Sequence, residues 1–260
     1  MKRIGLLTSG GDCSGLNAAI RAVVSSALER GWEVFGIHDA TNGLILRPLS
    51  YHQMTMKDFE FPFATLGGTM LGTTNQADPH TFLKNDGTTE KLTDEEIMAR
   101  FKEGLKLEAL VVIGGDGSMS IVSHYCQGTG VKMVGIPKTM DNDAPGTDLA
   151  IGFQTATQVV TDALDKLDTT AASHHRVMIA EVMGRGAGHL ALQAAKIFPR
   201  TLKPSSLKRF TKYPEMPLKV CPLMAFEVSP IGDLIPSATT IKAWLRPSSL
   251  MVFNFFKIPS

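Results

Sequence analysis

The sequence predicts an α/β protein built on a doubly wound, mostly parallel, Rossmann-like sheet. From residue 2 to about residue 195, short apolar runs alternate with amphipathic segments, which is typical of successive βαβ units. Glycine-rich loops follow three of these apolar runs, where an open α/β sheet gathers its ligands. With 260 residues and 43% hydrophobic side chains, the chain is long enough for one large or two modest domains.

The individual elements follow from the hydrophobic pattern. Strands are expected over residues 3–8, 33–37, 109–113, 132–136 and 177–182, and helices over 16–30, 94–106 and 118–126. A longer helix is expected from about residue 155, with its buried face formed by Val159, Val160, Ala163, Leu164 and Leu167. Residues 45–105 are less regular, and we expect their glycine-rich part, 67–75, to return to the functional site.

Composition argues against several classes of partner. The net charge of +1 favours neither a nucleic acid nor an anionic membrane surface, and no apolar run is long enough to span a bilayer. The N-terminus turns polar and glycine-rich within a few residues, so we expect no signal peptide. The three cysteines, Cys13, Cys126 and Cys221, lack metal-ligand spacing, which favours a reducing, cytoplasmic location.

Residues 196–260 differ from the rest of the chain. They carry ten Lys or Arg against three Asp or Glu, and they hold nine of the 14 prolines but one of the 24 glycines. Their apolar residues follow no clear period of strand or helix. We interpret them as an atypical basic, Pro-rich tail that is poorly ordered and arises from a shifted reading frame, an aberrant exon or a gene fragment.

The Gly-Gly-Asp-Gly-Ser loop at 114–118 indicates phosphate chemistry. Its glycines let backbone N–H groups approach phosphate oxygens at the start of a helix. A carboxylate in this turn, Asp116, suits Mg²⁺, which prefers a few carboxylates together with phosphate oxygens. The alternative is a solvated Asp in a turn. Lipid kinases and NAD kinases also carry a Gly-Asp-Gly signature, so the loop alone indicates a nucleotide phosphate and not the acceptor.

The loop at 9–15 opens the first expected helix and can present N–H groups to phosphate in the same way. On its own it is equally compatible with a tight turn, in which Cys13 is a small turn residue. A Rossmann-type dehydrogenase would want Gly-x-Gly-x-x-Gly at this point. The chain instead places Asp12 in the crowded turn, so we set that class aside.

The loop at 137–143 adds the groups that a transfer reaction needs. A hydroxyl that attacks a γ-phosphate requires a carboxylate to accept its proton and a second carboxylate to orient the site or hold the metal. Asp141 and Asp143 alternate along this loop beside Thr139, so both can point the same way. The alternative is a cluster of Asx turns at 141–143. With the neighbouring glycine loop, the pattern favours phosphoryl transfer.

In this order the motifs resemble the 6-phosphofructokinase family over residues 1–195. The matching segments are Thr8–Asp12, Gly67–Gly72, Gly114–Ser118, Pro137–Asp143, Ile151–Phe153, Ser173–Arg176 and Glu181–Arg185. The resemblance implies the N-terminal portion of the phosphofructokinase fold, with residues 1–195 as its nucleotide-binding and catalytic α/β region. It also implies Mg²⁺-dependent transfer of the ATP γ-phosphate to fructose 6-phosphate, which gives fructose 1,6-bisphosphate in glycolysis.

The resemblance further implies roles for single residues. Asp141 looks like the proton acceptor, Asp143 like its supporting carboxylate and Asp116 like the magnesium residue. Thr139 would hydrogen-bond the transferred phosphoryl group, and Arg185 would stabilise its charge. The residues that would lie along the nucleotide are Gly11, Gly115, Gly117, Ser118, Asn75 and Gln76. Those matching the sugar-phosphate site are Thr139, Asp141, Arg176, Met183, Gly184 and Arg185.

Two positions bear on the phosphoryl donor. Gly117 resembles the ATP-using branch, because an Asp there would put charge and bulk where the α-phosphate must lie. Lys138 resembles the pyrophosphate-using branch, in which the lysine neutralises the leaving phosphate. We weigh Gly117 more heavily and predict ATP. Asn75 and Gln76 stand near where many members place an arginine that bridges both phosphates, and Lys138 can compensate for that loss.

Three functions are considered, of which the loops favour the first and the atypical tail favours the third. The first is an ATP-dependent 6-phosphofructokinase, and the second is a pyrophosphate-dependent one. The third is an inactive fragment that binds nucleotide or joins full-length subunits. Because Arg176 matches an arginine that reaches a neighbouring subunit's substrate, the resemblance also implies a homo-oligomer.

Overall fold

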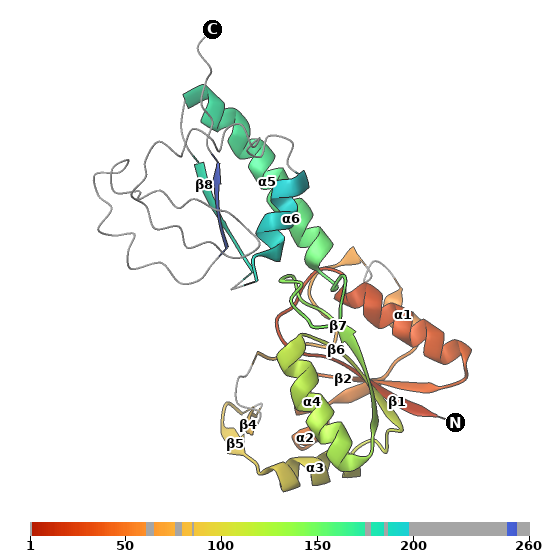
Figure 1. Cartoon of the computed structure of the whole chain (residues 1–260). Coiled ribbons are helices and arrows are strands. Elements are labelled where there is room, and N and C mark those ends of the chain that lie inside the picture. The colour runs from red at the N-terminus through yellow and green to blue at the C-terminus, as the bar shows by residue number, and fades with distance from the viewer. Residues whose placement is uncertain are drawn as a thin grey trace. The chain divides into compact units, whose positions relative to one another are not determined.

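A computed structural model describes residues 2–60, 65–75, 80–84, 86–174, 178–184 and 187–197, together with the strand at 249–253. The chain divides into two compact units, Met1–Phe153 and Gln154–Ser260 (Figure 1). The interpretation of residues 198–260 as an atypical tail lies outside the described residues, apart from that one strand. The expected boundary near residue 195 stays a prediction.

The first unit contains a five-stranded sheet in the order β3-β2-β1-β6-β7. Its strands are β1 (Arg3–Thr8), β2 (Glu33–Ile37), β3 (Tyr51–Gln53), β6 (Ala109–Gly114) and β7 (Lys132–Pro137). All neighbouring pairs are parallel except β2 with β3. From β1 the chain builds outward first to β2 and later to β6 on the other side. The strand order therefore reverses between β1 and β6, which is where doubly wound sheets bind ligands.

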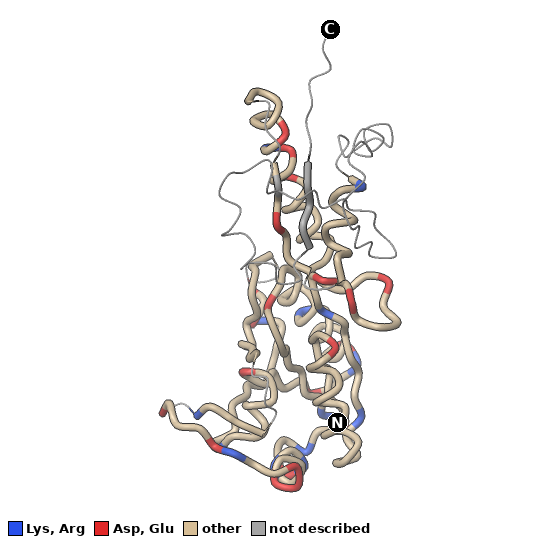
Figure 2. The backbone as a smooth tube through the Cα atoms, turned by 60° about the vertical axis from the view of Figure 1, so that its left-hand side comes forward, with Lys and Arg blue, Asp and Glu red and all other residues tan. Residues whose placement is uncertain are grey.

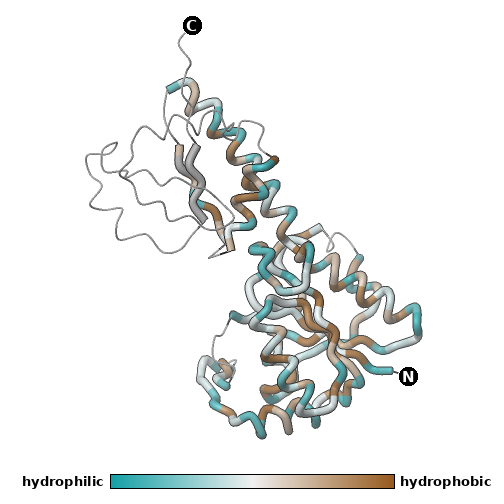
Figure 3. Tube along the Cα trace, viewed as in Figure 1, coloured by the Kyte–Doolittle hydropathy of each residue, from teal (hydrophilic) through white to brown (hydrophobic). Residues whose placement is uncertain are grey.

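Helices cover both faces of this sheet. They are α1 (Leu16–Glu29), α2 (Asn42–Ile45), the 3₁₀ turn η1 (Met56–Phe59), α3 (Asp94–Glu103) and α4 (Asp116–Thr129). One core cluster joins α1 to side chains such as Leu6 and Val34, and a second joins α2, α3 and α4 to Leu7 and Val112. Because side chains alternate along a strand, consecutive residues Leu6 and Leu7 enter opposite cores. Figure 3 shows the resulting hydrophobic strands between the helices.

The excursion at 45–105 adds a small hairpin to the first unit. Its strands β4 (Thr81–Leu83) and β5 (Thr89–Lys91) pair antiparallel ahead of α3. Thr93 caps α3 by accepting from the Glu96 N–H, while the Glu96 carboxylate accepts from the Thr93 N–H. This reciprocal capping fixes where the helix begins.

The second unit contains α5 (Phe153–His174), β8 (Met178–Val182), α6 (His189–Ile197) and β9 (Ser249–Phe253). β8 and β9 pair antiparallel. A small core joins Leu164 of α5 to Ala191 and Ala194 of α6.

The expected elements are present, with differences at some helix ends and in one buried face. Helix α3 ends at Glu103 and not at residue 106, and α4 ends at Thr129 and not at residue 126. Helix α4 begins at Asp116 and not at Ser118, so the aspartate lies in the first helical turn, where a negative charge is favourable. The expected buried face of α5 is wrong for Val159, which is 62% exposed, and for Ala163. The buried positions are Phe153, Thr157, Thr161, Leu164, Asp168 and Ala171. Three of these buried residues, Thr157, Thr161 and Asp168, are polar, so a search for hydrophobic periodicity does not find this face.

Charged residues of both signs are interspersed along the described chain (Figure 2). The expectation of no nucleic-acid or membrane partner, which rests on the net charge of the whole chain, stays a prediction. Among the described residues, no helix combines the length and apolar character needed to cross a bilayer.

Candidate functional site

Three loops of the first unit meet at the carboxyl end of its sheet. They follow β1, β6 and β7, which are neighbours in the order β1-β6-β7. Because parallel strands present all their carboxyl ends at one edge, loops that are far apart in sequence converge there. The sequence-predicted loops 9–15, 114–118 and 137–143 are thereby brought together.

The loop after β1 is tied to the loop after β6. The Ser9 N–H donates to the Ile113 carbonyl at 3.0 Å, and the Ser9 hydroxyl donates to Ser118 Oγ at 2.9 Å. Gly10 takes a φ of +84°, a conformation that favours glycine. Gly11 is exposed, so its backbone is open to a ligand.

The loop after β6 turns directly into α4. Gly115 is the N-cap residue in an extended conformation, and no side chain caps the helix there. The first N–H groups of a helix have no intrahelical partner, and they carry the positive end of its dipole. A Cβ added at Gly117 would meet nothing within 4 Å. This opening agrees with the prediction that Gly117 leaves room for a nucleotide phosphate.

Lys138 is buried between these loops, with 5% of its surface exposed. Its N–H donates to the Gly114 carbonyl at 2.9 Å, and its ammonium donates to the Gly11 carbonyl. Burial lowers the pKa of the Lys138 ammonium, and the nearby Cys13 thiol, Asp12 and Asp141 act in the opposite direction. A cation is therefore held in the interior, beside the loop where a phosphate would bring negative charge.

The loop after β7 arranges its polar side chains around Thr139. The Thr139 hydroxyl accepts from the Asp141 N–H at 3.2 Å and donates to Asp143 Oδ1 at 3.4 Å. Asp141 is partly buried, and Asp143 is exposed. The structure therefore contains local turn contacts, as expected for a cluster of Asx turns. It also contains two neighbouring carboxylates, as expected for phosphoryl transfer. The two interpretations are compatible.

Asn142 holds this loop and was missed from the sequence. It has a φ of +52°, its side-chain amide donates to the Asp148 carbonyl at 3.1 Å, and its Oδ1 accepts from the Ala150 N–H at 2.8 Å. Asn tolerates the left-handed conformation better than most residues, which was the available signal. The clamp fixes the backbone between the two aspartates.

The glycine-rich segment 65–75 closes one side of the site, as expected. The Thr73 hydroxyl donates to the Gly10 carbonyl at 2.5 Å, and the Gly10 N–H donates to the Thr74 carbonyl at 3.1 Å. Asn75 is exposed, and its Oδ1 lies 4.0 Å from where a Cβ on Gly11 would lie. Gln76 lies outside the described residues.

The predicted residues of the second unit are described only in part. Met183 is 65% exposed and Gly184 is buried with a φ of +133°. Arg176 and Arg185 lie outside the described residues. Their assignment to substrate binding stays a prediction.

The donor set around Asp116 suits Mg²⁺ in one particular way. No group of three or more His, Cys, Asp or Glu in the described residues could hold a metal by itself. Mg²⁺ commonly binds through one or two carboxylates and takes its other ligands from substrate phosphates and water. Asp116, exposed at the start of α4, fits that mode.

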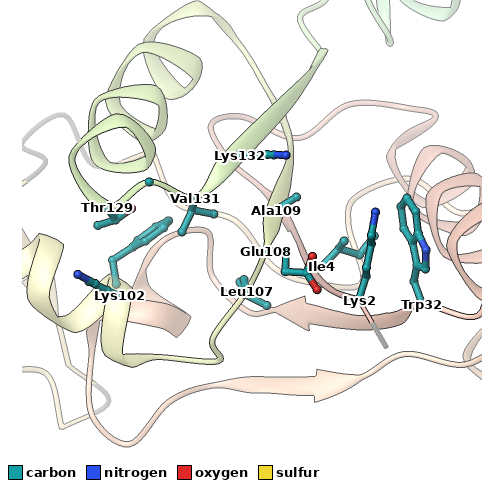
Figure 4. Close-up of a pocket in the computed structure, with 12 residues that line it drawn as sticks. Lys2, Ile4, Trp32, Lys102, Leu107, Glu108, Ala109, Thr129, Val131 and Lys132 are labelled. Atoms are coloured by element: carbon teal, nitrogen blue, oxygen red, sulfur yellow. The ribbon is translucent and has the colours of Figure 1, made fainter.

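A cleft of about 450 Å³ lies at the opposite end of the sheet and contains none of the predicted site residues. Lys2, Glu108 and Lys132 line it at the amino ends of β1, β6 and β7 (Figure 4). The Lys2 ammonium lies 5.3 Å from the centre of the Trp32 ring. The backbone N–H groups of Glu108 and Lys132 already donate to carbonyls in the chain. These two N–H groups are therefore not free to bind an anion in this recess.

Glycine loops at the reversal point of a doubly wound sheet, with a buried cation and carboxylates beside them, are typical of phosphate-binding α/β proteins. The chain belongs to the phosphofructokinase family, whose model matches residues 3–197. It is 55% identical over 193 residues to ATP-dependent 6-phosphofructokinase 1 of Nostoc sp., covering 74% of this chain and 53% of the relative. It is 48% identical over 193 residues to the ATP-dependent 6-phosphofructokinase of Chloroflexus aggregans, covering 74% and 53%.

Solved structures agree with the fold. The phosphofructokinase of Saccharomyces cerevisiae matches with a TM-score of 0.58 and 30% identity, over 75% of this chain and 28% of that one. A pyrophosphate-dependent phosphofructokinase from Marinobacter aquaeolei matches with a TM-score of 0.55 and 19% identity, over 78% and 51%, and this likeness concerns the fold alone. The chain spans about half the length of the curated relatives it matches.

Proposed function

We propose that the chain carries the nucleotide-binding and phosphoryl-transfer loops of an ATP-dependent 6-phosphofructokinase. The observation that carries this proposal is the convergence of the loops after β1, β6 and β7 around Lys138 and Asp141. The relatives named ATP-dependent 6-phosphofructokinase support the choice of ATP and fructose 6-phosphate as substrates.

In this proposal Asp141 accepts the proton of the attacking sugar hydroxyl. Thr139 receives a hydrogen bond from the Asp141 N–H, which fixes the loop so that the carboxylate is held in place. Asp143, bonded to the Thr139 hydroxyl, keeps that hydroxyl oriented beside the transferred group. The side chain of Asn142 restricts the backbone between the two carboxylates, so positioning contributes to the rate.

The first glycine loop and the start of α4 would bind the nucleotide phosphates through backbone N–H groups and Ser118. Asp116 would hold Mg²⁺, which when bound neutralises charge on the phosphate oxygens. We propose that Met183, Gly184, Arg185 and Arg176 bind the sugar phosphate, with Arg176 reaching a neighbouring subunit in a homo-oligomer. A cytoplasmic location is supported by the free thiols of Cys13 and Cys126 in the described part of the chain.

Two other functions are tested beside this one. Burial of Lys138 beside the glycine loops favours pyrophosphate as donor, because a cation there can neutralise a leaving phosphate. The third function, a nucleotide-binding or subunit-partner protein without activity of its own, is an outcome of the same test.

A coupled assay with fructose 6-phosphate, Mg²⁺ and either ATP or pyrophosphate separates the three functions. We expect product with ATP and little with pyrophosphate. Gly117→Asp should abolish use of ATP, because it fills the opening beside that residue with a charged side chain. Product with pyrophosphate alone would establish the second function. Binding of Mg²⁺-ATP in calorimetry without product would establish the third.

A further inference from the structure

Asp39 follows β2 in a conformation that few residues adopt. Its φ is +53°, and that of the next residue, Ala40, is +59°. Neither residue is a glycine, so both are held in the left-handed region by the contacts around them. Such strained backbone persists where the surrounding structure over-determines it, and it is common next to functional loops.

The contacts that hold Asp39 are made with the segment 65–75. Its N–H donates to the Leu71 carbonyl at 2.9 Å. Its carboxylate lies against Gly72, in the space that a side chain at that position would fill. Gly72 has a φ of +71°, and its carbonyl accepts from the Thr8 hydroxyl at 2.7 Å. The segment is therefore seated between the ends of β1 and β2.

From Gly72 the contacts continue into the first glycine loop. Thr73 and Thr74 make their hydrogen bonds to Gly10, as described above. A displacement of Gly72 would thus be transmitted to Gly10 through Thr73 and Thr74. Asp39 itself has no direct hydrogen bond to the glycine loop, so it can act on that loop only through this segment.

The residue before Asp39, His38, forms a pair with His52 of β3. His38 Nε2 lies 2.9 Å from Nδ1 of His52 on β3, and His38 Nδ1 lies 3.1 Å from the Ser50 hydroxyl. Two ring nitrogens at this distance share one proton, because one must donate and the other accept. When both rings are protonated, the two N–H groups face each other and the bond is lost.

We propose that Asp39 is a positioning residue for the segment 65–75, and that protonation of His38, whose ring contacts His52, loosens this support. The charged or titratable groups acting on the His38 ring are His52, from β3, and Asp39, from its own turn. The segment on the far side of Asp39 presents uncharged Leu71 and Gly72. A consequence for nucleotide binding rests on the function proposed above.

The direction of the pH effect follows from the surroundings of the ring. Burial, and then His52, lower the pKa of His38 from its ordinary value of 6.5, while Asp39 opposes them. The folded state therefore binds this proton less readily than the unfolded state. The support is fully present above the ordinary pKa, and it weakens as the pH falls from there through the lower folded value.

Nuclear magnetic resonance tests the positioning directly. In the whole chain, the amide signals of Gly72 and Thr74 should titrate together with the ring carbons of His38. In Asp39→Asn the His38 ring should still titrate while Gly72 no longer follows it. In His52→Asn, which keeps a hydrogen-bonding group near Nδ1, the coupled titration should disappear. The proposal would be overturned if the Gly72 amide signal did not titrate with the His38 ring in the natural chain. It would also be overturned if that signal titrated equally in Asp39→Asn.

Calorimetry with Mg²⁺-ATP tests the consequence for the glycine loop. Affinity should fall roughly threefold to tenfold below the His38 titration, as expected for coupling through packed contacts. The fall should vanish in His52→Asn and persist in His124→Asn, which alters an exposed histidine on α4. A fall of equal size in all three proteins would contradict the coupling. If no nucleotide binds at any pH while Gly72 follows His38, the proposed function fails and the positioning of the segment stands.

Discussion

The amino end of the central sheet has a cleft, whereas the carboxyl end has the loops of the candidate site. The amino end has the cleft of about 450 Å³, lined by exposed lysines. The carboxyl end has loops clamped by side chains and a buried ammonium. At the amino end the N–H groups of Glu108 and Lys132 already donate to carbonyls, while at the carboxyl end no side chain caps the start of α4. The candidate site is therefore identified by its converging polar groups and not by the volume of a cleft.

The largest expected difference between the two ends is in the rate of phosphoryl transfer. Asp141→Asn keeps the size of the side chain but removes the proposed proton acceptor, so the rate in the coupled assay should fall by roughly 10² to 10⁴. Glu108→Gln, a matched change in the cleft, should leave the rate unaltered. Similar losses in both variants would refute the assignment of the base.

The next largest effect concerns two glycines with positive φ. Gly152 has a φ of +101°, and a Cβ there would come within 2.6 Å of Cys13 Sγ, whereas Gly130 beside the cleft has a φ of +75° and open space. Gly152→Ala should lower the free energy of unfolding by about 3 kcal/mol, because backbone strain and overpacking add. Gly130→Ala should lower it by about 1 kcal/mol from strain alone.

Denaturant unfolding monitored on the first unit's tryptophan, Trp32, measures both variants. Adding Cys13→Ala should restore part of the loss in Gly152→Ala and none in Gly130→Ala. Equal losses at the two glycines would mean that the crowding at the carboxyl end does not limit stability.

A smaller effect is expected from the clamp in the acidic loop. Asn142→Ala removes two hydrogen bonds and leaves a non-glycine residue at positive φ, so it should cost about 2 kcal/mol. Asn142→Gly keeps the conformation and should cost about 1 kcal/mol, from the lost bonds alone. Thermal unfolding orders the two variants, and a larger loss in the glycine variant would contradict the clamp.

The smallest change in stability is expected at Lys138, and its sign is positive. The described residues give this buried ammonium no carboxylate at ion-pair distance, so Lys138→Met should stabilise the fold by about 1 kcal/mol while weakening phosphate binding. Lys132→Met, at the exposed cleft, should change stability by less than about 0.5 kcal/mol.

The pH dependence of Lys138→Met provides the check. Because the folded pKa of Lys138 lies below its ordinary value of 10.5, the natural chain should gain stability as pH rises through that interval. Urea titrations at rising pH should show this gain in the natural chain and its absence in the methionine variant. A parallel pH profile in both would exclude Lys138 as its source.

Local residue types accounted for most of the strands and for three of the loops. Apolar runs such as 109–113 and the glycines after them could be identified without tertiary contacts, because period and turn chemistry are properties of neighbouring residues. The buried face of α5 could not, since Thr157, Thr161 and Asp168 are polar and are buried only by their surroundings. The role of Asp39 could not be predicted either, because its contact with Gly72 joins two segments that lie far apart in the sequence.

The sequence by itself determined the α/β class, the order of the elements and the chemical types gathered in the loops after β1, β6 and β7. Only the tertiary structure decided that β1, β6 and β7 are neighbours, that Lys138 is buried against Gly11 and that Asn142 and Asp39 hold the loops in place. Hydrophobic period and turn preference act over a few residues, whereas the packing of distant strands sets which loops meet.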